Sequence, residues 1–366
     1  MDSRLTAKTG STSIGFDAQI FRRQRRGGIS RYFSELACHL DSAGASVRTG
    51  WEQPRRVLTR YQPWRQADVV HATFYGGQPY RLRSQQRLVS SLFDMTPERH
   101  PEHFFLPALR SPHANKSRWL EASDLILSIS AASADDLAFF QPNLHVPLRV
   151  IHLATAIDRL IPKPVAALAG RRFWLMVGKR HAYKNGITVL RALALLHGGR
   201  TIQDSRTTLP LLVCAGGGPW RPDERRWITG QSLENTVMQL PAEDPVLAWL
   251  YRHAETVLVP SLAEGFSLPL IEALACDTPV IASDLEVHRE VGQGYATLLP
   301  ALNAQAWAER LAANERTATS PSMQLGAQRY GLVRSHYAHE RLVQEHLEAY
   351  GSTIHCPGTQ MNNKRD

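Results

Sequence analysis

The chain has 366 residues, of which 43% are hydrophobic and 20% charged, and its formal net charge is +9. These values are typical of a globular protein with room for two domains, and they exclude an intrinsically disordered chain. No stretch approaches the roughly 20 continuous apolar residues of a membrane-spanning helix. The first residues, MDSRLTAKTGSTSIGF, lack the apolar centre of a signal peptide. We therefore expect a cytoplasmic protein.

The cysteines are scattered along the chain and include no CxxC pair. This spacing favours buried free thiols and indicates neither a disulfide framework nor a zinc site. The four residues are Cys38, Cys214, Cys276 and Cys356.

Basic residues are concentrated in the first third of the chain. Residues 1–118 hold 19 Lys/Arg against 9 Asp/Glu, with clusters at Arg22–Arg26, Arg55-Arg56 and Arg81-Leu82-Arg83. Such a surface suits nucleic acid, an anionic membrane or a phosphorylated substrate, and it also occurs as an ordinary solvated surface. The charge alone does not decide between these alternatives.

The first half alternates short apolar runs with amphipathic stretches, the pattern of parallel βαβ units. Strands are predicted at SIGFDAQIF (13–21), ADVVHAT (67–73), RLVSSLFD (87–94), the end of WLEASDLILSIS (119–130) and RVIHLA (149–154). Helices are predicted at ISRYFSELACHLDSAG (29–44) and at SAASADDLAFF (130–140), which has a serine cap.

Residues 158–170, DRLIPKPVAALAG, predict an interdomain linker, after which the pattern restarts. The predicted strands are RRFWLMVG (171–178), LPLLVCAGGGP (209–219), TVMQL (236–240), TVLVPS (256–261) and TPVIAS (278–283). The predicted helices are ITVLRALALLHGG (187–199), PVLAWLYRHA (245–254), LPLIEALACD (268–277) and most of the chain from Asn303 to the end of RLVQEHLEAY (341–350).

These elements predict an α/β fold of two doubly wound domains facing a cleft. Ligands of such sheets bind outside the carboxyl ends of the strands, so the loops after strands are the candidate sites. Gly27 and Gly28 would let the backbone approach an anion at a helix N-terminus, or form a flexible turn. Arg180 and Lys184, in the loop VGKRHAYKNG, could hold phosphate groups, or belong to a solvated charged loop. The turn AGGGP (215–219) indicates only a sharp bend or a close approach.

The stretch VPSLAEGFSLPLIEALACDTPVIAS (259–283) places Glu264 beside Gly265 in a loop and Glu272 early in an apolar helix. A carboxylate near a helix N-terminus gains about 0.3–1 kcal/mol from the helix dipole, which could explain Glu272 by itself. A buried carboxylate also needs hydrogen-bond donors, and sugar hydroxyls are suitable ones.

The frame EGFSLPLIEALACDTPVIAS (264–283) resembles the retaining glycosyltransferases of family 4, which have the two-Rossmann-domain GT-B architecture. That family has two glutamates separated by seven residues in such a frame. The resemblance extends over residues 12 to about 350. Further segments occur in the family's order: RYFSELACHL, SISAASADDL, RVIHLATAID, GKRHAYKN and LYRHAETVLVPS.

The resemblance implies roles for individual residues. Glu264 would lie beside the hydroxyls of the donor sugar, and Glu272 would accept hydrogen bonds from the nucleotide ribose. Arg180 and Lys184 would hold the diphosphate and offset the charge of the leaving group. The diphosphate would also lie near the backbone amides of Gly265, Phe266, Ser267 and Leu268. Gly27 and Gly28 would approach it from the first domain.

One position departs from the family pattern. Members often have a histidine in a frame like HDxxPE that contacts the donor sugar, and this chain has Phe93 there with Asp94 retained. Asp94, or His71 at the end of ADVVHAT, could take over that contact, or the contact could be dispensable. A hydrogen-bonded loop histidine is the plainer interpretation of His71.

The resemblance implies transfer of a hexose from a nucleotide diphosphate sugar to a hydroxyl, with retention and without a metal or cofactor. The segments YKN and FDMTPE resemble bacterial enzymes of O-antigen and surface-polysaccharide synthesis, which favours mannose from GDP-mannose. The expected acceptor is a lipid-linked saccharide at an anionic inner membrane face. The alternatives are a non-catalytic nucleotide-sugar-binding accessory subunit and a nucleic-acid-binding protein, although no nucleic-acid motif is present.

Four segments are expected from this pattern. Residues 1–160 form the acceptor-side Rossmann-like domain, and residues 161–335 form the nucleotide-sugar-binding domain. Residues 336–350 form a helix that crosses back to the first domain, and residues 351–366 form a polar tail.

Overall fold

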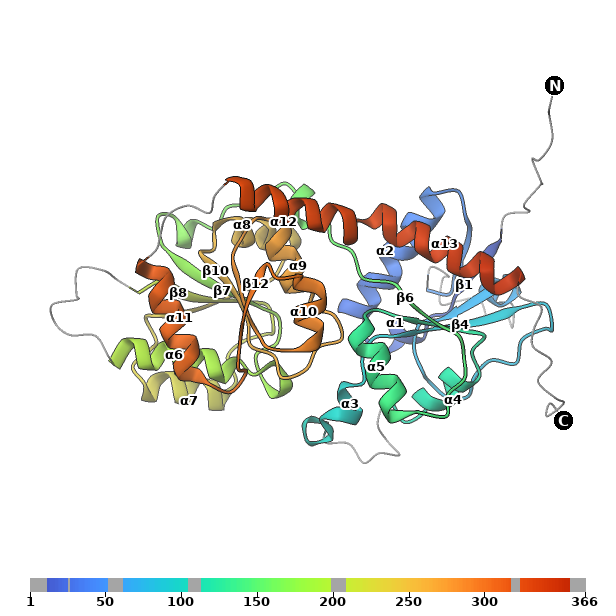
Figure 1. Cartoon of the computed structure of the whole chain (residues 1–366), viewed down its shortest axis with the longest axis horizontal. Helices are drawn as coiled ribbons and strands as arrows, with labels where there is room; N and C mark the ends of the chain where they lie inside the picture. The colour runs from blue at the N-terminus through green and yellow to red at the C-terminus, as the bar shows by residue number, and fades with distance from the viewer. Residues whose placement is uncertain are drawn as a thin grey trace, which may run out of the picture.

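The computed structural model describes residues 12–25, 27–51, 62–104, 113–198, 209–316 and 323–355. Two Rossmann-like domains lie side by side, and the C-terminal helices run across both of them (Figure 1). Each domain is built on a parallel sheet of six strands. The predicted fold class is therefore confirmed.

The first sheet has the strand order β2-β1-β3-β4-β5-β6. Its strands are β1 Ser13–Phe16, β2 Ser46–Thr49, β3 Val69–Ala72, β4 Arg87–Leu92, β5 Leu125–Ser128 and β6 Leu148–Val150. The helical segments of this domain are α1 Gln19–Arg23, α2 Gly28–Ser42, η1 Pro63–Gln66, α3 Thr96–Arg99, η2 Pro101–His103, α4 Lys116–Glu121 and α5 Ala131–Phe140. Apolar residues of α2 pack on one face of the sheet, and those of α4 and α5 pack on the other.

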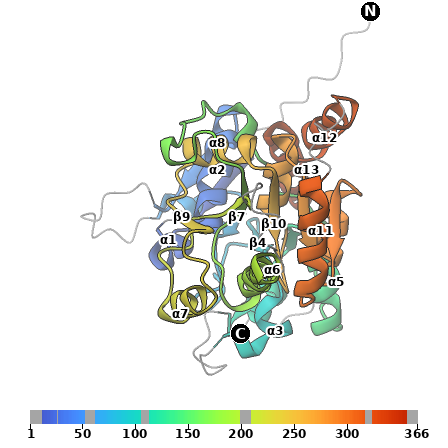
Figure 2. The same cartoon turned by 90° about the vertical axis from the view of Figure 1, so that its left-hand side faces the viewer.

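The second sheet has the order β12-β11-β10-β7-β8-β9. Its strands are β7 Phe173–Val177, β8 Leu211–Ala215, β9 Val237–Leu240, β10 Thr256–Val259, β11 Val280–Ser283 and β12 Ala296–Leu299. Its helices are α6 Gly186–Gly198, α7 Pro222–Gly230, α8 Asp244–His253, α9 Leu268–Ala275, α10 Glu286–Gly292 and α11 Ala304–Arg316. Helices α6 and α11 lie side by side on one face (Figure 2), and α8, α9 and α10 pack on the other.

The two domains are joined by the chain around η4 Ile157–Arg159 and η5 Ala166–Leu168, which is the predicted linker region. After α12 Met323–His336, helix α13 His339–His355 packs its apolar residues into the core of the first domain. This helix extends five residues into the segment predicted as a polar tail, and the remaining tail lies outside the described residues.

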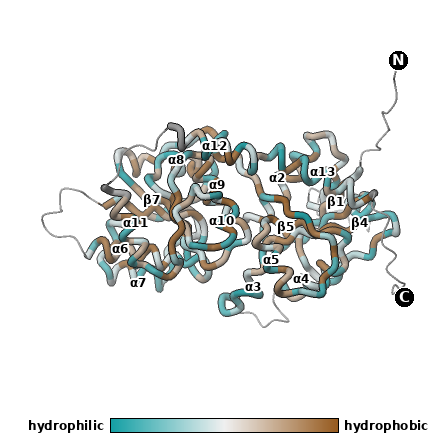
Figure 3. Tube along the Cα trace, in the orientation of Figure 1, coloured by the Kyte–Doolittle hydropathy of each residue, from teal (hydrophilic) through white to brown (hydrophobic). Residues whose placement is uncertain are grey.

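Several central strands, such as β5, are hydrophobic along their length, and the short helix α3 is hydrophilic (Figure 3). The predicted strand 13–21 ends early because Asp17 turns the chain into α1. The Asp17 carboxylate accepts hydrogen bonds from the backbone N–H groups of Gln19 and Thr73 at 3.0 and 3.2 Å. Strand β1 therefore stops at Phe16.

Candidate active site

A hollow in the second domain lies where the strand order of its sheet reverses. Strands β7 and β10 are neighbours there, although β8 and β11 continue the sheet in opposite directions. Doubly wound sheets bind ligands at such a reversal, outside the carboxyl ends of the strands. The residues that line this second-domain hollow are Met176, Val177, Lys179, Lys184, Leu258, Val259, Pro260, Ser261, Glu264 and Pro269.

An ion pair between Lys184 and Glu264 lies in this hollow. Lys184 Nζ donates to Glu264 Oε2 at 2.6 Å, and Ser261 Oγ donates to Oε1 at 2.7 Å. Burial opposes ionisation of Glu264, but attraction to Lys184 and these hydrogen bonds hold its pKa below the usual value. Burial also disfavours the Lys184 cation, and the attraction of Glu264 outweighs it and raises the lysine pKa. Both groups are therefore charged at neutral pH.

The turn before α6 directs Lys184 toward Glu264. Residues 182–184 form the 3₁₀ turn η6, and Asn185 follows in the left-handed conformation with φ 52°. Asn185 Nδ2 donates to the carbonyl oxygens of Pro260 and Ala301 at 2.9 and 2.8 Å. The asparagine thus fixes the turn to the end of β10, where the Glu264 loop begins.

The Arg180 side chain lies in a different place from that of Lys184. It is only 3% exposed, and its guanidinium donates to the carbonyl oxygens of Gly216, Gly218 and Pro219 and to Glu224. The ring of Trp220 lies 4.4 Å from the guanidinium carbon. In the structure Arg180 therefore fastens the glycine turn after β8 to the loop after β7.

Close packing of these two loops explains Gly217 of the AGGGP turn. Gly217 has φ +70°, and a Cβ there would lie 2.3 Å from the Gly178 carbonyl oxygen. The turn after β8 therefore lies directly against the loop after β7 and supports it.

Lys179 is a residue of this hollow to which the sequence analysis gave no role. It is exposed and lines the hollow together with Lys184. The sequence position of Lys179 indicates this location, because Lys179 follows Gly178, where the chain leaves the sheet directly after β7. The cations among the residues that line the hollow are therefore Lys179 and Lys184, and Arg180 lies behind them.

The N-terminus of α9 lies at the same hollow through Pro269. Ser267 precedes the helix with φ 89° and ψ 65°, a conformation that non-glycine residues rarely adopt outside constrained sites. Its buried Oγ has no hydrogen-bond partner. Phe266 packs its ring against His152 and Tyr337, so this residue can offer a ligand only its backbone. The first N–H groups of a helix lack intrahelical partners and attract anions.

Glu272 lies in the second turn of α9 and is partly buried. Tyr251 Oη donates to Glu272 Oε2 at 2.6 Å, so the carboxylate has a donor within the protein. Burial raises the Glu272 pKa to about 7, and the Tyr251 hydrogen bond and the charge of Arg31 partly oppose this rise. Arg31 comes from the first domain and forms an ion pair with Asp244 of α8 at 2.8 Å. Glu272 therefore faces the junction of the two domains.

The Glu264 loop lies directly against the first domain. A Cβ on Gly265 would lie 1.9 Å from the Phe93 carbonyl oxygen and 3.0 Å from the Asp94 Cβ. The Gly265 carbonyl oxygen accepts hydrogen bonds from Ser130 Oγ and Ser133 Oγ at 2.7 and 3.2 Å. Glycine at 265 thus allows the two halves of the candidate site to meet.

A first-domain hollow lies on the other side of this contact. It is lined by Ile29, Thr73, Phe74, Tyr75, Ser91, Phe93, Asp94, His113 and Lys116. Its aromatic residues are Phe74, Tyr75, Phe93 and His113. The buried Lys116 ammonium donates to Glu98 Oε2 and to the Asp94 carbonyl oxygen, both at 2.9 Å, so its charge is already balanced. Asp94 Oδ1 accepts the Thr96 N–H at 2.9 Å.

Phe93 and His71 occupy different environments. Phe93 lines the first-domain hollow and packs edge-on against Tyr32 with ring centroids 5.4 Å apart. His71 is fully buried and is hydrogen-bonded through Nδ1 to Tyr350 and through Nε2 to Ser91, both at 2.8 Å. Desolvation lowers the His71 pKa well below its usual value. His71 thus links α13 to the first sheet, and both of its ring nitrogens are already hydrogen-bonded within the protein.

The glycine pair and the basic cluster lie at the start of the first domain. Gly27 precedes α2 and Gly28 is its first residue, while Ile29 reaches the first-domain hollow. Of the cluster Arg22–Arg26, Arg26 lies outside the described residues, as do Arg55 and Arg56. The others are exposed, and the Arg23 guanidinium lies 4.9 Å from the centre of the Phe74 ring.

Residues 159–320 match the family model of glycosyl transferases group 1. The chain is 27% identical over 257 residues to O-antigen chain mannosyltransferase B of Escherichia coli, covering 66% of this chain and 64% of that protein. It is 34% identical over 168 residues to a D-inositol 3-phosphate glycosyltransferase of Jonesia denitrificans, covering 43% and 38%. The chain thus spans less than two thirds of the length of these relatives.

Solved structures of low sequence identity have the same fold. Sucrose-phosphate synthase from Thermosynechococcus elongatus superposes with a TM-score of 0.65 at 19% identity, over 93% of this chain and 95% of that one. HepE from Anabaena, in complex with UDP and glucose, superposes with a TM-score of 0.65 at 17% identity, over 93% and 100%. These likenesses establish the GT-B architecture, and the family match supports a glycosyltransferase.

Proposed function

We propose that the protein is a retaining hexosyltransferase that uses a nucleotide diphosphate sugar, with GDP-mannose as the favoured donor. The observation that carries this proposal is the Lys184–Glu264 pair at the strand-order reversal beside the N-terminus of α9. Cations and free helix amides suit a diphosphate, and a carboxylate beside them suits sugar hydroxyls. The likeness to an O-antigen mannosyltransferase favours mannose.

In the proposed reaction, the bond between the sugar C1 and the diphosphate oxygen breaks and a bond from C1 to the acceptor oxygen forms on the same face. The acceptor proton passes to the departing diphosphate. Lys184 and Lys179 offset the charge that develops on this leaving group, and the α9 amides add to that effect. Arg180 acts as a positioning residue through the glycine turn. No metal is assigned to the transfer step.

Glu264 orients the donor sugar by accepting hydrogen bonds from its hydroxyls. Its low pKa keeps it an acceptor at neutral pH, and the Ser261 and Lys184 contacts fix its direction. Glu272 accepts hydrogen bonds from the ribose hydroxyls, in addition to the one that it receives from the Tyr251 hydroxyl.

The acceptor in this proposal is the end of a lipid-linked saccharide of a surface polysaccharide or O-antigen, bound in the first-domain hollow. Aromatic rings stack on the apolar face of a pyranose, and Phe74 and Phe93 provide such rings. Asp94 supplies a carboxylate there, while the Lys116 charge is balanced by Glu98. This arrangement favours an uncharged sugar over a phosphorylated acceptor. The location that we propose for the protein is the cytoplasm, with peripheral association at an anionic membrane face.

Thermal shift with GDP, UDP, ADP and dTDP tests the donor assignment. A ligand at 100 times its Kd adds about 2.7 kcal/mol of stability, so a preferred nucleotide stands out. We expect the largest shift with GDP in the wild type and a much smaller one in Glu272→Ala. Equal shifts with all four nucleotides would contradict the donor assignment.

A turnover assay distinguishes an enzyme from a non-catalytic accessory subunit. The latter is the alternative that would explain Phe93 in place of the family's histidine. Incubation with GDP-mannose and a lipid-linked saccharide, in the presence of a chelator, is expected to give a product whose new linkage is α by NMR, like the donor. Nucleotide binding without any product would instead support the accessory subunit.

A further inference from the structure

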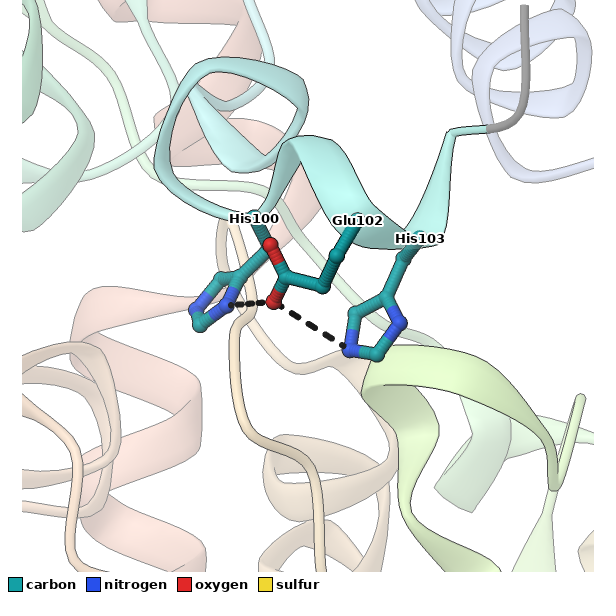
Figure 4. A group of neighbouring side chains, drawn as sticks. All are labelled: His100, Glu102 and His103. Carbon is teal, nitrogen blue, oxygen red and sulfur yellow. Dashed lines mark hydrogen bonds and ion pairs between the residues drawn. The ribbon is translucent and has the colours of Figure 1, made fainter.

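A second group of chemically active side chains lies outside both hollows, in the turn that follows α3. His100, Glu102 and His103 point toward one another, with the Glu102 carboxylate between the two imidazoles (Figure 4). One nitrogen of each histidine and a carboxylate oxygen lie within 4.8 Å of one another. Among the described residues, this is the group of His, Cys, Asp or Glu that meets such a spacing.

The local sequence explains this convergence. Pro101 opens the 3₁₀ turn η2, and its ring fixes the backbone angle that the turn requires. His100 immediately precedes this turn, and its carbonyl oxygen accepts the backbone N–H of His103 at 3.1 Å, which closes the turn between the two histidines. Their rings stack with centroids 5.9 Å apart and planes at 24°. The turn is therefore held in shape by backbone geometry.

The distances between donor atoms are close to those of a tetrahedral metal site. Glu102 Oε1 lies 3.1 Å from His100 Nδ1 and 3.8 Å from His103 Nε2. Ligands about 2.0–2.1 Å from a tetrahedral zinc ion lie about 3.3 Å from one another. The two histidine nitrogens lie within 4.8 Å of each other, so a shared metal ion requires the imidazoles to turn toward it.

The His103 ring supplies a second observation. Its Nε2 is shielded from solvent and has no hydrogen-bond partner, because the Glu102 oxygen is beyond hydrogen-bonding distance. A buried polar atom without a partner is costly, and a bound cation would satisfy it. His100 Nδ1, by contrast, is within hydrogen-bonding distance of Glu102.

We propose that His100, Glu102 and His103 bind one divalent metal ion of the zinc class, with water as the remaining ligand. Two imidazoles and one carboxylate form a ligand set that zinc accepts. The site serves structure rather than transfer. The ring of His103 lies 6.4 Å from that of Tyr183, and Phe104 stacks on Tyr183 at 6.0 Å. The Lys184 ammonium lies 5.3 Å from the centre of the Tyr183 ring, so a metal that fixes η2 also supports the ring beside Lys184.

The test is a Zn²⁺ titration of the full chain against a chromogenic chelator, after metal has been removed by dialysis. We expect the wild type to bind one more equivalent than His100→Ala/His103→Ala. The matched control is His39→Ala/His339→Ala, which removes another close histidine pair with ring centroids 4.5 Å apart beside Glu35. The control is expected to keep the equivalent that the first variant loses. Equal stoichiometry in the wild type and His100→Ala/His103→Ala would overturn the proposal.

Glu102→Gln tests the carboxylate without threatening the fold, because this side chain is 61% exposed. We expect weaker Zn²⁺ binding and an altered visible spectrum of the Co²⁺-substituted protein. An unchanged affinity would remove Glu102 from the ligand set and overturn the three-ligand site. The effect of a chelator on transfer is also measured in His100→Ala/His103→Ala, which lacks this site. This comparison distinguishes loss of the structural metal from a metal requirement of the reaction.

Discussion

Lys184 and Glu264 come from loops 80 residues apart in the chain and meet at 2.6 Å where β7 and β10 lie side by side. The ion pair depends on how the two loops are held together. The Asn185 side chain of the first loop donates a hydrogen bond to the Pro260 carbonyl oxygen at the start of the second. The charges offset one another in the free protein, and a bound diphosphate would compete with Glu264 for Lys184. This pair therefore carries no net charge before the donor arrives, and Lys179 adds one positive charge to the hollow.

Removal of Lys184 is expected to lower kcat strongly. Lys184→Ala loses a cation aimed at the leaving group, and loss of one such electrostatic contact typically costs about 10²–10³ in rate. The variant also leaves the Glu264 carboxylate partly buried without its cation, so we expect a lower Tm. Steady-state transfer kinetics and thermal denaturation check both effects.

The double variant Lys184→Ala/Glu264→Gln separates the two effects. It removes the uncompensated charge, so Tm should recover toward the wild-type value while transfer stays low. Lys163→Ala, an exposed lysine of the linker, is the matched control and should keep full activity. Recovery of transfer in the double variant would contradict a direct role of Lys184.

The sequence predicted the loops of this site better than the side-chain directions within them. Strands β7 and β10 are apolar runs and the glutamate frame is specific, so the location of Lys184 and Glu264 followed from pattern and resemblance. Arg180 and Lys179 are adjacent in sequence, and the direction of Arg180 depends on the glycine turn after β8, which accepts its hydrogen bond from 36 residues away. No local pattern encodes that contact.

Short elements with few apolar residues were also missed. Strand β2 has the sequence SVRT and α7 has PDERRWITG, and both are held by neighbours rather than by a periodic apolar face. The metal-ligand turn was missed for a similar reason. His100, Glu102 and His103 have no standard ligand spacing, and they converge through the turn that begins at His100 and includes η2.

Glu272 is expected to make stability fall as pH rises. Its pKa is about 7 in the folded protein against 4.5 for the unperturbed group. The folded state therefore binds this proton more tightly, and the stabilisation present below pH 4.5 is lost as pH rises through 7. The loss is about 3–4 kcal/mol, because the pKa differs by about 2.5 units and one unit corresponds to about 1.4 kcal/mol.

Comparison with Glu272→Gln isolates this contribution from other titrating groups. Glutamine mimics the protonated carboxyl and can still accept the Tyr251 hydrogen bond. Urea denaturation between pH 5 and 8 should show the variant gaining on the wild type as pH increases. A constant difference between the two proteins across this range would be inconsistent with the raised pKa.

The exposed arginines near α1 are expected to bind anionic membranes. Arg22, Arg23 and Arg25 lie together on the first domain, and electrostatic binding of this kind weakens with salt. Co-sedimentation with phosphatidylglycerol vesicles should fall with salt and fall further in the triple alanine variant. The control variant replaces Arg221, Arg225 and Arg226, which are exposed on the second domain. Equal loss in both variants would point to net charge rather than to this surface.

The contact at Gly265 is expected to control how closely the two domains can meet. Gly265→Ala adds a methyl group 1.9 Å from the Phe93 carbonyl oxygen, a backbone atom that cannot move aside by a side-chain rotation. The two loops must separate, and the Ser130 and Ser133 hydrogen bonds to residue 265 lengthen with them. We therefore expect transfer to be largely lost while GDP binding to the second domain persists.

Gly230→Ala is the control, because a Cβ there meets no atom within 4 Å and the residue ends α7. It should leave both transfer and GDP binding unchanged. Calorimetric GDP titration and transfer kinetics together distinguish the outcomes. Equal loss of GDP binding and transfer in Gly265→Ala would mean that the substitution distorts the second-domain hollow itself. Full transfer would mean that catalysis does not require the Phe93–Gly265 contact.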